Sequence, residues 1–162
     1  MKRYMLFVIL LLATCKMTAQ YIEIVPSLNQ SGALKLAEQA TLEAEKINKN
    51  VSIAVLDASG VILLLLKGDA VGPHNTEASR RKAYTALSTK TPSLDLMHNT
   101  AESKDAKNLN TLPELLLLGG GVPIWDAGKL IGSIGLSGGG GGENDHNIAQ
   151  KAVENLGFKI NK

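Results

Sequence analysis

Cysteine is almost missing from this sequence: its 162 residues include one, Cys15. If the N-terminal segment is removed, or if Cys15 carries a lipid, the folded domain has no thiol. Disulfide bonds, cysteine-based metal sites and cysteine nucleophiles are then excluded. Aromatic residues are also few, with three Tyr, two Phe and one Trp. We therefore expect a core of Leu, Ile, Val and Ala.

An excess of charge of one sign is missing as well. The whole chain has 17 basic and 15 acidic side chains. Without Lys2, Arg3 and Lys16, residues 21–162 have 14 basic against 15 acidic side chains, a net charge of −1. A nearly neutral domain gives no electrostatic reason to expect nucleic acid or an anionic membrane as a partner.

One long apolar run is present, at the N-terminus. Lys2 and Arg3 precede an unbroken apolar stretch over residues 4–13, which is too short to span a bilayer but suits a signal peptide. We predict a signal peptide over residues 1–20, followed by one domain over residues 21–162. An alternative is a lipoprotein signal that ends before Cys15, which would then be a lipid anchor. Either form predicts an exported protein, periplasmic or secreted.

Apolar periodicity predicts four main elements of helix. Alanines and leucines recur at helical spacing after Ser27, and Ser27 or Ser31 could cap that helix. Thr76 and Ser93 are the expected caps of the next two, and Asn144 or Asp145 of the last. Residues 102–110 are polar and read as a surface connection. The expected helices lie at 27–50, from 76 to before Pro92, from 93 through 97, and up to Leu156.

Five short apolar runs predict strands, bounded by turn residues such as those at 57–60 and 126–129. We expect five mostly antiparallel strands with helices against the faces, an α+β (α/β layered) domain. The last run alternates apolar residues with Gly132, Ser133 and Gly135, and glycine in a strand permits close approach of a helix or a ligand. The expected strands are 51–56, 61–66, 115–118, 122–125 and 130–136.

Three histidines could bind a ligand. His74 follows Gly72-Pro73, a stiff stretch just ahead of a helix, and a single imidazole can ligate haem iron. His98 on the short helix is the second possibility, whereas His146 is expected to be exposed to solvent. None has the paired spacing of a zinc helix.

Cationic residues follow His74 along the same helix. Arg80 or Lys82 could neutralise a carboxylate of a ligand. We place Arg81 on the solvated face. Lys82 lies among small residues and, if partly buried, needs an acidic partner such as Asp57 or Asp69.

A glycine run at 138–142 precedes the last helix and could hold an anion at the helix N-terminus. It lacks the ending of a P-loop and the spacing of a dinucleotide fingerprint.

Several linked motifs resemble the GlcG/HbpS-like, "haem-degrading" family. The segment 52–60 is similar to its opening hairpin, and Gly72-Pro73-His74 with 78–86 is similar to its central helix. The segments 119–124 and 131–138, with Gly128 and Asp145, are similar to its C-terminal signature. The resemblance covers about residues 28–157, and it departs from the family pattern at Lys67-Gly68-Asp69.

The resemblance implies a profilin-like fold, assembly as a homo-oligomer, and haem or related tetrapyrrole binding in some members. It implies His74 and the helix segment from Lys82 to Thr85 as pocket residues. With Arg80 and His98 these form the predicted haem-binding set, in which His74 is the expected iron ligand.

Three functions remain in competition. The first is an extracytoplasmic haem-binding protein, with apolar walls from Val55, Leu64, Leu66 and the 122–136 hairpin. The second is an oligomeric module that binds a small organic anion and catalyses nothing. The third, an enzyme that opens the haem ring, needs an electron donor, and the sequence supplies no redox group.

Overall fold

A computed structural model describes residues 23–162 of the chain. The predicted signal peptide over residues 1–20 and the possible lipid anchor at Cys15 lie outside these residues. Within them, no helix combines the length and the apolar character that a bilayer span requires.

The first elements form a helix and a hairpin. Helix α2 (Gln30–Glu45) is shorter than predicted, and its cap is Asn29, whose Oδ1 accepts the N–H of Gly32 at 2.9 Å. Neither predicted serine fills this role, because the Ser27 hydroxyl instead accepts the N–H of Ala58. Strands β1 (Ser52–Asp57) and β2 (Ile62–Leu66) pair antiparallel, as the sequence predicts.

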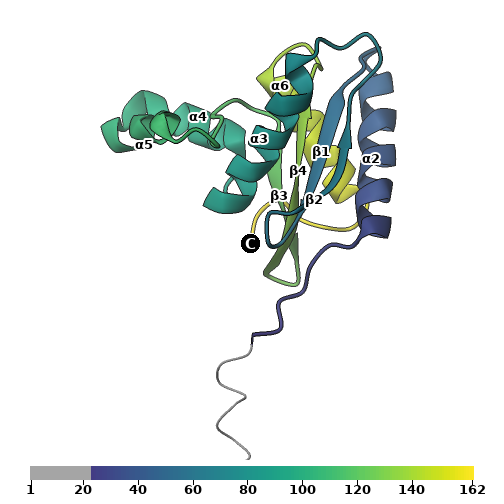
Figure 1. The fold of residues 1–162 in the computed structure, drawn as a ribbon, viewed down its shortest axis with the longest axis horizontal. Coiled ribbons are helices and arrows are strands. Elements are labelled where there is room, and N and C mark those ends of the chain that lie inside the picture. Colours follow the sequence, from purple (N-terminus) through teal and green to yellow (C-terminus); the bar gives the residue numbers. More distant parts are fainter. Residues whose placement is uncertain (1–22) are drawn as a thin grey trace, which may run out of the picture.

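The middle of the chain is helical. Helix α3 (His74–Thr89) begins two residues before the predicted cap, so that His74 lies in its first turn. Helix α4 (Ser93–Glu102) follows Pro92 as expected. The predicted connection contains a short helix α5 (Lys104–Asn108) and a 3-10 turn η2 (Leu109–Thr111). Figure 1 shows α4 and α5 as an arm to one side of the sheet.

The chain then returns to the sheet. Strands β3 (Gly121–Asp126) and β4 (Lys129–Ser137) form the second hairpin, and helix α6 (Gly142–Glu154) follows the glycine run. The sheet is entirely antiparallel, in the order β2-β1-β4-β3. Helix α3 covers one face, while α2 and α6 cover the other (Figure 1).

Residues 23–162 form four strands, and the predicted fifth strand at 115–118 is not among them and is wrong. Leu115 and Leu117 are buried, but the backbone of this segment bonds to side chains of two helices. Leu116 donates its N–H to Thr85 Oγ1, Leu115 O accepts from Arg81, and Leu118 O accepts from Ser93. A short apolar run cannot distinguish such a tethered segment from a strand.

The two faces of the sheet differ in the size of their side chains. Ile53, Val55, Ile134 and Leu136 belong to the large core under α2 and α6. The cluster opposite α3 is smaller, with Ala54 and Leu56 from the sheet. A Cβ at Gly135 would overlap the carbonyl oxygen of Ser79 and the amide nitrogen of Ala83. At Gly121 it would overlap the carbonyl oxygen of Lys82. The predicted use of glycine for close approach is therefore confirmed, and the approaching element is helix α3.

His146 lies where α6 meets the arm, and the prediction that it is exposed is wrong. The residue is 8% exposed, and its Nδ1 is buried without a hydrogen-bond partner. Burial lowers the pKa of His146, and His98 on α4 acts in the same direction, against Asp95 and Gln150, which raise it. Burial thus disfavours the protonated form of His146 within the fold.

Replacing Gly135 by alanine tests the contact between α3 and the sheet. The added methyl group meets helix backbone, which cannot move aside, so we expect a loss of about 1–3 kcal/mol of unfolding free energy. Urea denaturation measures it. Lys129→Ala, at the exposed start of the same strand, should stay within about 0.5 kcal/mol of wild type. Equal stability of Gly135→Ala and wild type would contradict the packing described.

The buried His146 predicts a loss of stability in acid. Its pKa in the fold lies below the ordinary 6.5, so the unfolded chain binds a proton that the native state refuses. The unfolding free energy should fall as the pH drops below about 6.5, until the lowered native pKa is reached. Urea unfolding between pH 7 and 5 should show a shallower slope for His146→Gln than for wild type. If the unfolding free energy of both proteins changed with pH at the same slope, His146 would not be the cause of the loss of stability in acid.

Candidate functional site

One side of helix α3 faces a hollow of about 490 Å³. His74, Ala78 and Lys82 follow one another at four-residue spacing and all line it. This spacing places side chains on the same face of a helix. The stripe can be read from the sequence once the helix is known to begin at His74.

Other walls of the hollow come from elements distant in the sequence. Met97 of α4 and Leu118 of the tethered segment are apolar. Glycines of the 138–142 run and the first turn of α6 form the opposite wall. The hollow is therefore a mixed site, with apolar groups on the arm side and polar groups beside α6.

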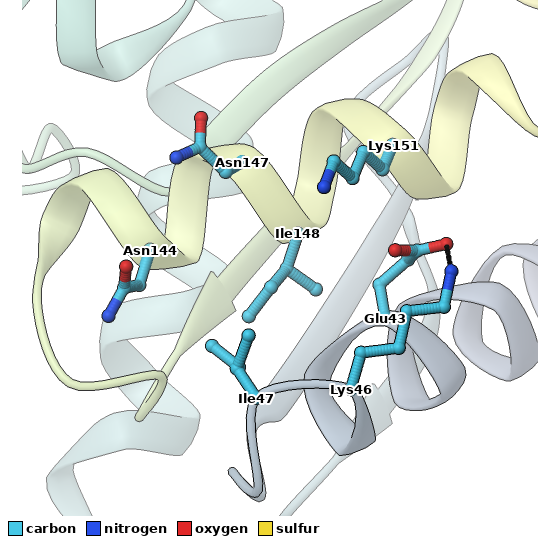
Figure 2. A pocket seen from close by; sticks show the side chains of 7 residues that line it. All are labelled: Glu43, Lys46, Ile47, Asn144, Asn147, Ile148 and Lys151. Carbon is cyan, nitrogen blue, oxygen red and sulfur yellow. Dashed lines mark hydrogen bonds and ion pairs between the residues drawn. The ribbon is translucent and has the colours of Figure 1, made fainter.

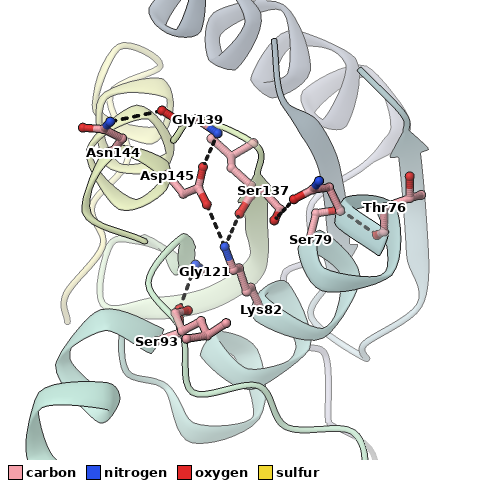
Figure 3. A network of polar contacts seen from close by, with 12 residues as sticks. Thr76, Ser79, Lys82, Ser93, Gly121, Ser137, Gly139, Asn144 and Asp145 are labelled. Carbon is pink, nitrogen blue, oxygen red and sulfur yellow. Dashed lines mark hydrogen bonds and ion pairs between the residues drawn. The ribbon is translucent and has the colours of Figure 1, made fainter. Parts of the chain in front are cut away.

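Lys82 is 3% exposed and crosses from α3 to α6 (Figure 3). Its Nζ lies 2.7 Å from Asp145 Oδ2 and 3.0 Å from the carbonyl oxygen of Leu136. The other oxygen of Asp145 accepts the N–H of Gly139 at 2.7 Å. Burial of Lys82 is thus confirmed, but its predicted partners Asp57 and Asp69 are wrong. The glycine run turns the chain so that α6 begins beside Lys82.

Two sets of N–H donors beside the Lys82–Asp145 ion pair have no acceptor among the described residues: one N–H of Lys82 and the first amides of α6. An ammonium carries three N–H donors, and among residues 23–162 Lys82 bonds to two acceptors. Helix α6 begins at Gly142 without a side-chain cap. The amides of its first turn can bind an anion, since this end of a helix dipole is positive. Lys82 and this turn both line the hollow, together with the carboxylates of Glu143 and Asp145.

His74 lies at the mouth of the hollow and is exposed to solvent. Beside it, Ser137 donates its hydroxyl to Asn75 Oδ1 at 2.7 Å, and both residues line the same hollow. An exposed imidazole at the edge of an apolar hollow is free to coordinate a metal that a ligand brings.

Three residues of the predicted haem-binding set do not line this hollow. Arg80 forms a hydrogen bond to Glu77 that, with a further contact to Glu114, raises its pKa. Thr85 is fully buried, donating to Arg81 O and accepting from Leu116 N. His98 is exposed on α4. The structure brings together His74 and Lys82 alone of the five.

The prediction that Arg81 lies on a solvated face is wrong. It is half-buried, its Nη2 donates to Leu115 O at 2.6 Å, and its Nε is buried without a partner. Arg81 therefore holds the tethered segment against α3.

The predicted apolar walls, including the 122–136 hairpin, do not line this hollow. Val55 is fully buried in the core under α2 and α6, and Leu64 packs against that core. Leu66 lines a different hollow, beside α2. Met97 and Leu118 take their place. No sequence signal marked these two, because their position depends on how the arm folds back.

A smaller hollow of about 150 Å³ lies between α2 and α6 (Figure 2). Ile47 and Ile148 line it, and Glu43 accepts from Lys46 at 2.7 Å and from Asn155 at 2.9 Å. The hydrogen bond from Lys46 is the largest cause of the lowered pKa of Glu43. We interpret these contacts as a joint between two helices. In residues 23–162 no group of three His, Cys, Asp or Glu side chains could hold a bare metal ion.

The chain is similar in sequence to several known proteins that are related to one another. The chain is 35% identical over 112 residues to protein GlcG of Escherichia coli K12, which covers 68% of this chain and 81% of GlcG. A 15.0 kDa protein from the dhaT-dhaS intergenic region of Citrobacter freundii is 30% identical over 139 residues, 80% of this chain and 92% of that protein. Corrinoid adenosyltransferase PduO of the same organism is 26% identical, and the match covers 38% of its length.

Solved structures agree with this result. A double mutant of HbpS from Streptomyces reticuli has a TM-score of 0.78 and 33% identity, covering 84% of this chain and 91% of that one. The PduOC:heme complex has a TM-score of 0.74 and 25% identity, covering 84% and 99%. The family model described as haem degrading protein HbpS-like matches residues 28–154. The chain therefore belongs to the HbpS-like family.

Proposed function

We propose that the protein binds haem in the hollow beside α3. The observation that carries the proposal is the His74-Ala78-Lys82 stripe, which faces a hollow of about 490 Å³ with Met97 and Leu118 on its far wall. Pockets of a few hundred Å³ with apolar walls and few polar groups suit organic cofactors. A relative in the same family has been solved as a complex with haem.

The residues present fit the group in three respects. His74 is the imidazole that would ligate the iron, and Met97 offers a thioether as a second ligand of a type known in haem proteins. The third N–H of Lys82 and the uncapped α6 N-terminus would take a propionate. Ala78 and Leu118 would cover part of the ring, and buried apolar area supplies about 25 cal/mol per Å² before the costs of binding.

Haem bound in this way would serve haem or iron handling or redox sensing outside the cytoplasm. Export rests on the predicted signal peptide. Assembly as a homo-oligomer is supported by the edge strand β2, where Ile62, Leu65 and Leu66 are each more than 40% exposed. An exposed apolar edge strand invites pairing with a second chain.

A small organic anion is the second candidate ligand of the same hollow. The uncapped N-terminus of α6 beside the glycine run favours it, because this arrangement needs no planar guest. Such a ligand would use Lys82 and α6 but not His74.

Titration with hemin separates the two ligands. Wild-type protein should shift the Soret band of hemin, and the shift should saturate as the titration proceeds. His74→Ala should weaken hemin binding about tenfold or more, since iron coordination is lost. His98→Ala is the matched control, an exposed histidine that does not line the hollow, and it should bind as wild type does. Thermal stabilisation by small organic acids with none by hemin would favour the second candidate.

Esterified haem tests the cationic side of the hollow. Hemin dimethyl ester has no carboxylate for Lys82 and α6, so we expect it to bind about tenfold more weakly than hemin. Absorbance titration of both ligands measures the ratio. His74→Ala should weaken the binding of hemin and of its dimethyl ester by the same factor. Equal affinities for hemin and its ester would place the propionates in solvent.

A further inference from the structure

A second large hollow lies at the other end of the sheet. It measures about 520 Å³ and lies where the β3–β4 hairpin meets residues 23–26, here called the N-terminal strap. The hollow beside α3, here called the haem hollow, adjoins the end of β4 at Ser137. The second hollow, here called the groove, adjoins the start of β4 at Lys129 and Leu130. The two hollows share no lining residue.

The groove has apolar walls, and within residues 23–162 those on the strap side are open to water. Trp125 and Leu130 line it from the hairpin, and Ile24 and Val25 from the strap. Ile24 is 90% exposed and Val25 53% exposed. Adjoining apolar side chains left open to water mark a surface that gains free energy when an apolar body covers it.

The charges at the groove are mostly of one sign. Lys90, Lys129 and Lys162 line it, against one acidic side chain, Glu23. None of the three lysines takes part in an ion pair within the described part of the chain. Among the described residues, the side-chain charges that line the groove are thus three positive and one negative.

Trp125 adds a buried polar group without a partner. The residue is 8% exposed and lines the groove, and its Nε1 makes no hydrogen bond. An unpaired buried donor is unfavourable.

We propose that this groove binds an amphipathic carboxylate, a molecule with one carboxylate on an aliphatic or aromatic body. The body covers Leu130 and the strap beside Trp125, while the carboxylate lies among the lysines. Apolar walls disfavour a small inorganic anion, and the lysines disfavour a cationic amphiphile. The proposal stands apart from haem binding, because it uses none of the residues of the haem hollow.

Fluorescence of Trp125 tests the proposal, because the chain has one tryptophan. Dodecanoate, used below its micelle concentration, should change the emission with saturation. Dodecyltrimethylammonium has a body of the same length and the opposite charge, and acetate has the charge without the body. Each should bind at least about tenfold more weakly than dodecanoate. No saturable change with dodecanoate, or equal binding of the cationic amphiphile, would overturn the proposal.

Charge reversal assigns the site. Lys129→Glu with Lys162→Glu should weaken dodecanoate binding about tenfold, since each exposed ion pair contributes up to about fivefold and the new charges repel the ligand. Lys67→Glu with Lys107→Glu makes the same change of net charge at exposed lysines outside the groove and should bind as wild type does. An equal loss in both double variants would overturn the site. His74→Ala should retain full dodecanoate binding, whatever its effect on hemin.

Discussion

The close approach of helix α3 to strands β3 and β4 is the constraint on which the rest of the structure depends. Side chains are absent at Gly121 and Gly135 because helix backbone occupies the space where a Cβ would lie. A helix held this near the sheet carries Lys82 down to the carbonyl oxygen of Leu136. There the lysine is out of water, and it requires an acidic partner.

Asp145 meets that requirement and thereby forms one side of the site. Because the carboxylate binds both Lys82 and the amide of Gly139, it fixes the glycine run and the start of α6 beside α3. The hollow is the space that remains between this ion pair and the arm. A buried ion pair adds little net stability but costs several kcal/mol to break. Its consequence here is positional, since it holds a charged donor and a helix N-terminus at the wall of the hollow that lies opposite Met97 and Leu118.

Much of the fold could be predicted from local pattern. Four strands, both hairpins and the helix before Pro92 follow from periodicity and turn residues, and the glycines of β4 correctly indicated close packing. The run Leu115–Leu118 could not be assigned, because its hydrogen bonds go to Thr85, Arg81 and Ser93 across the fold. For the site, His74 and Lys82 were identified, whereas the partner of Lys82 and the wall residue Met97 were not. Both depend on contacts between segments far apart in sequence. The profilin-like label and the signal peptide remain predictions.

Crystals grown with hemin give the most direct test of the account, through anomalous scattering at the iron edge. The account predicts one iron peak at bonding distance from the imidazole of His74, with the ring plane between Ala78 and Leu118 and a propionate directed toward Lys82 and the first turn of α6. An iron peak bound elsewhere, with the α3 hollow holding only water, would contradict it.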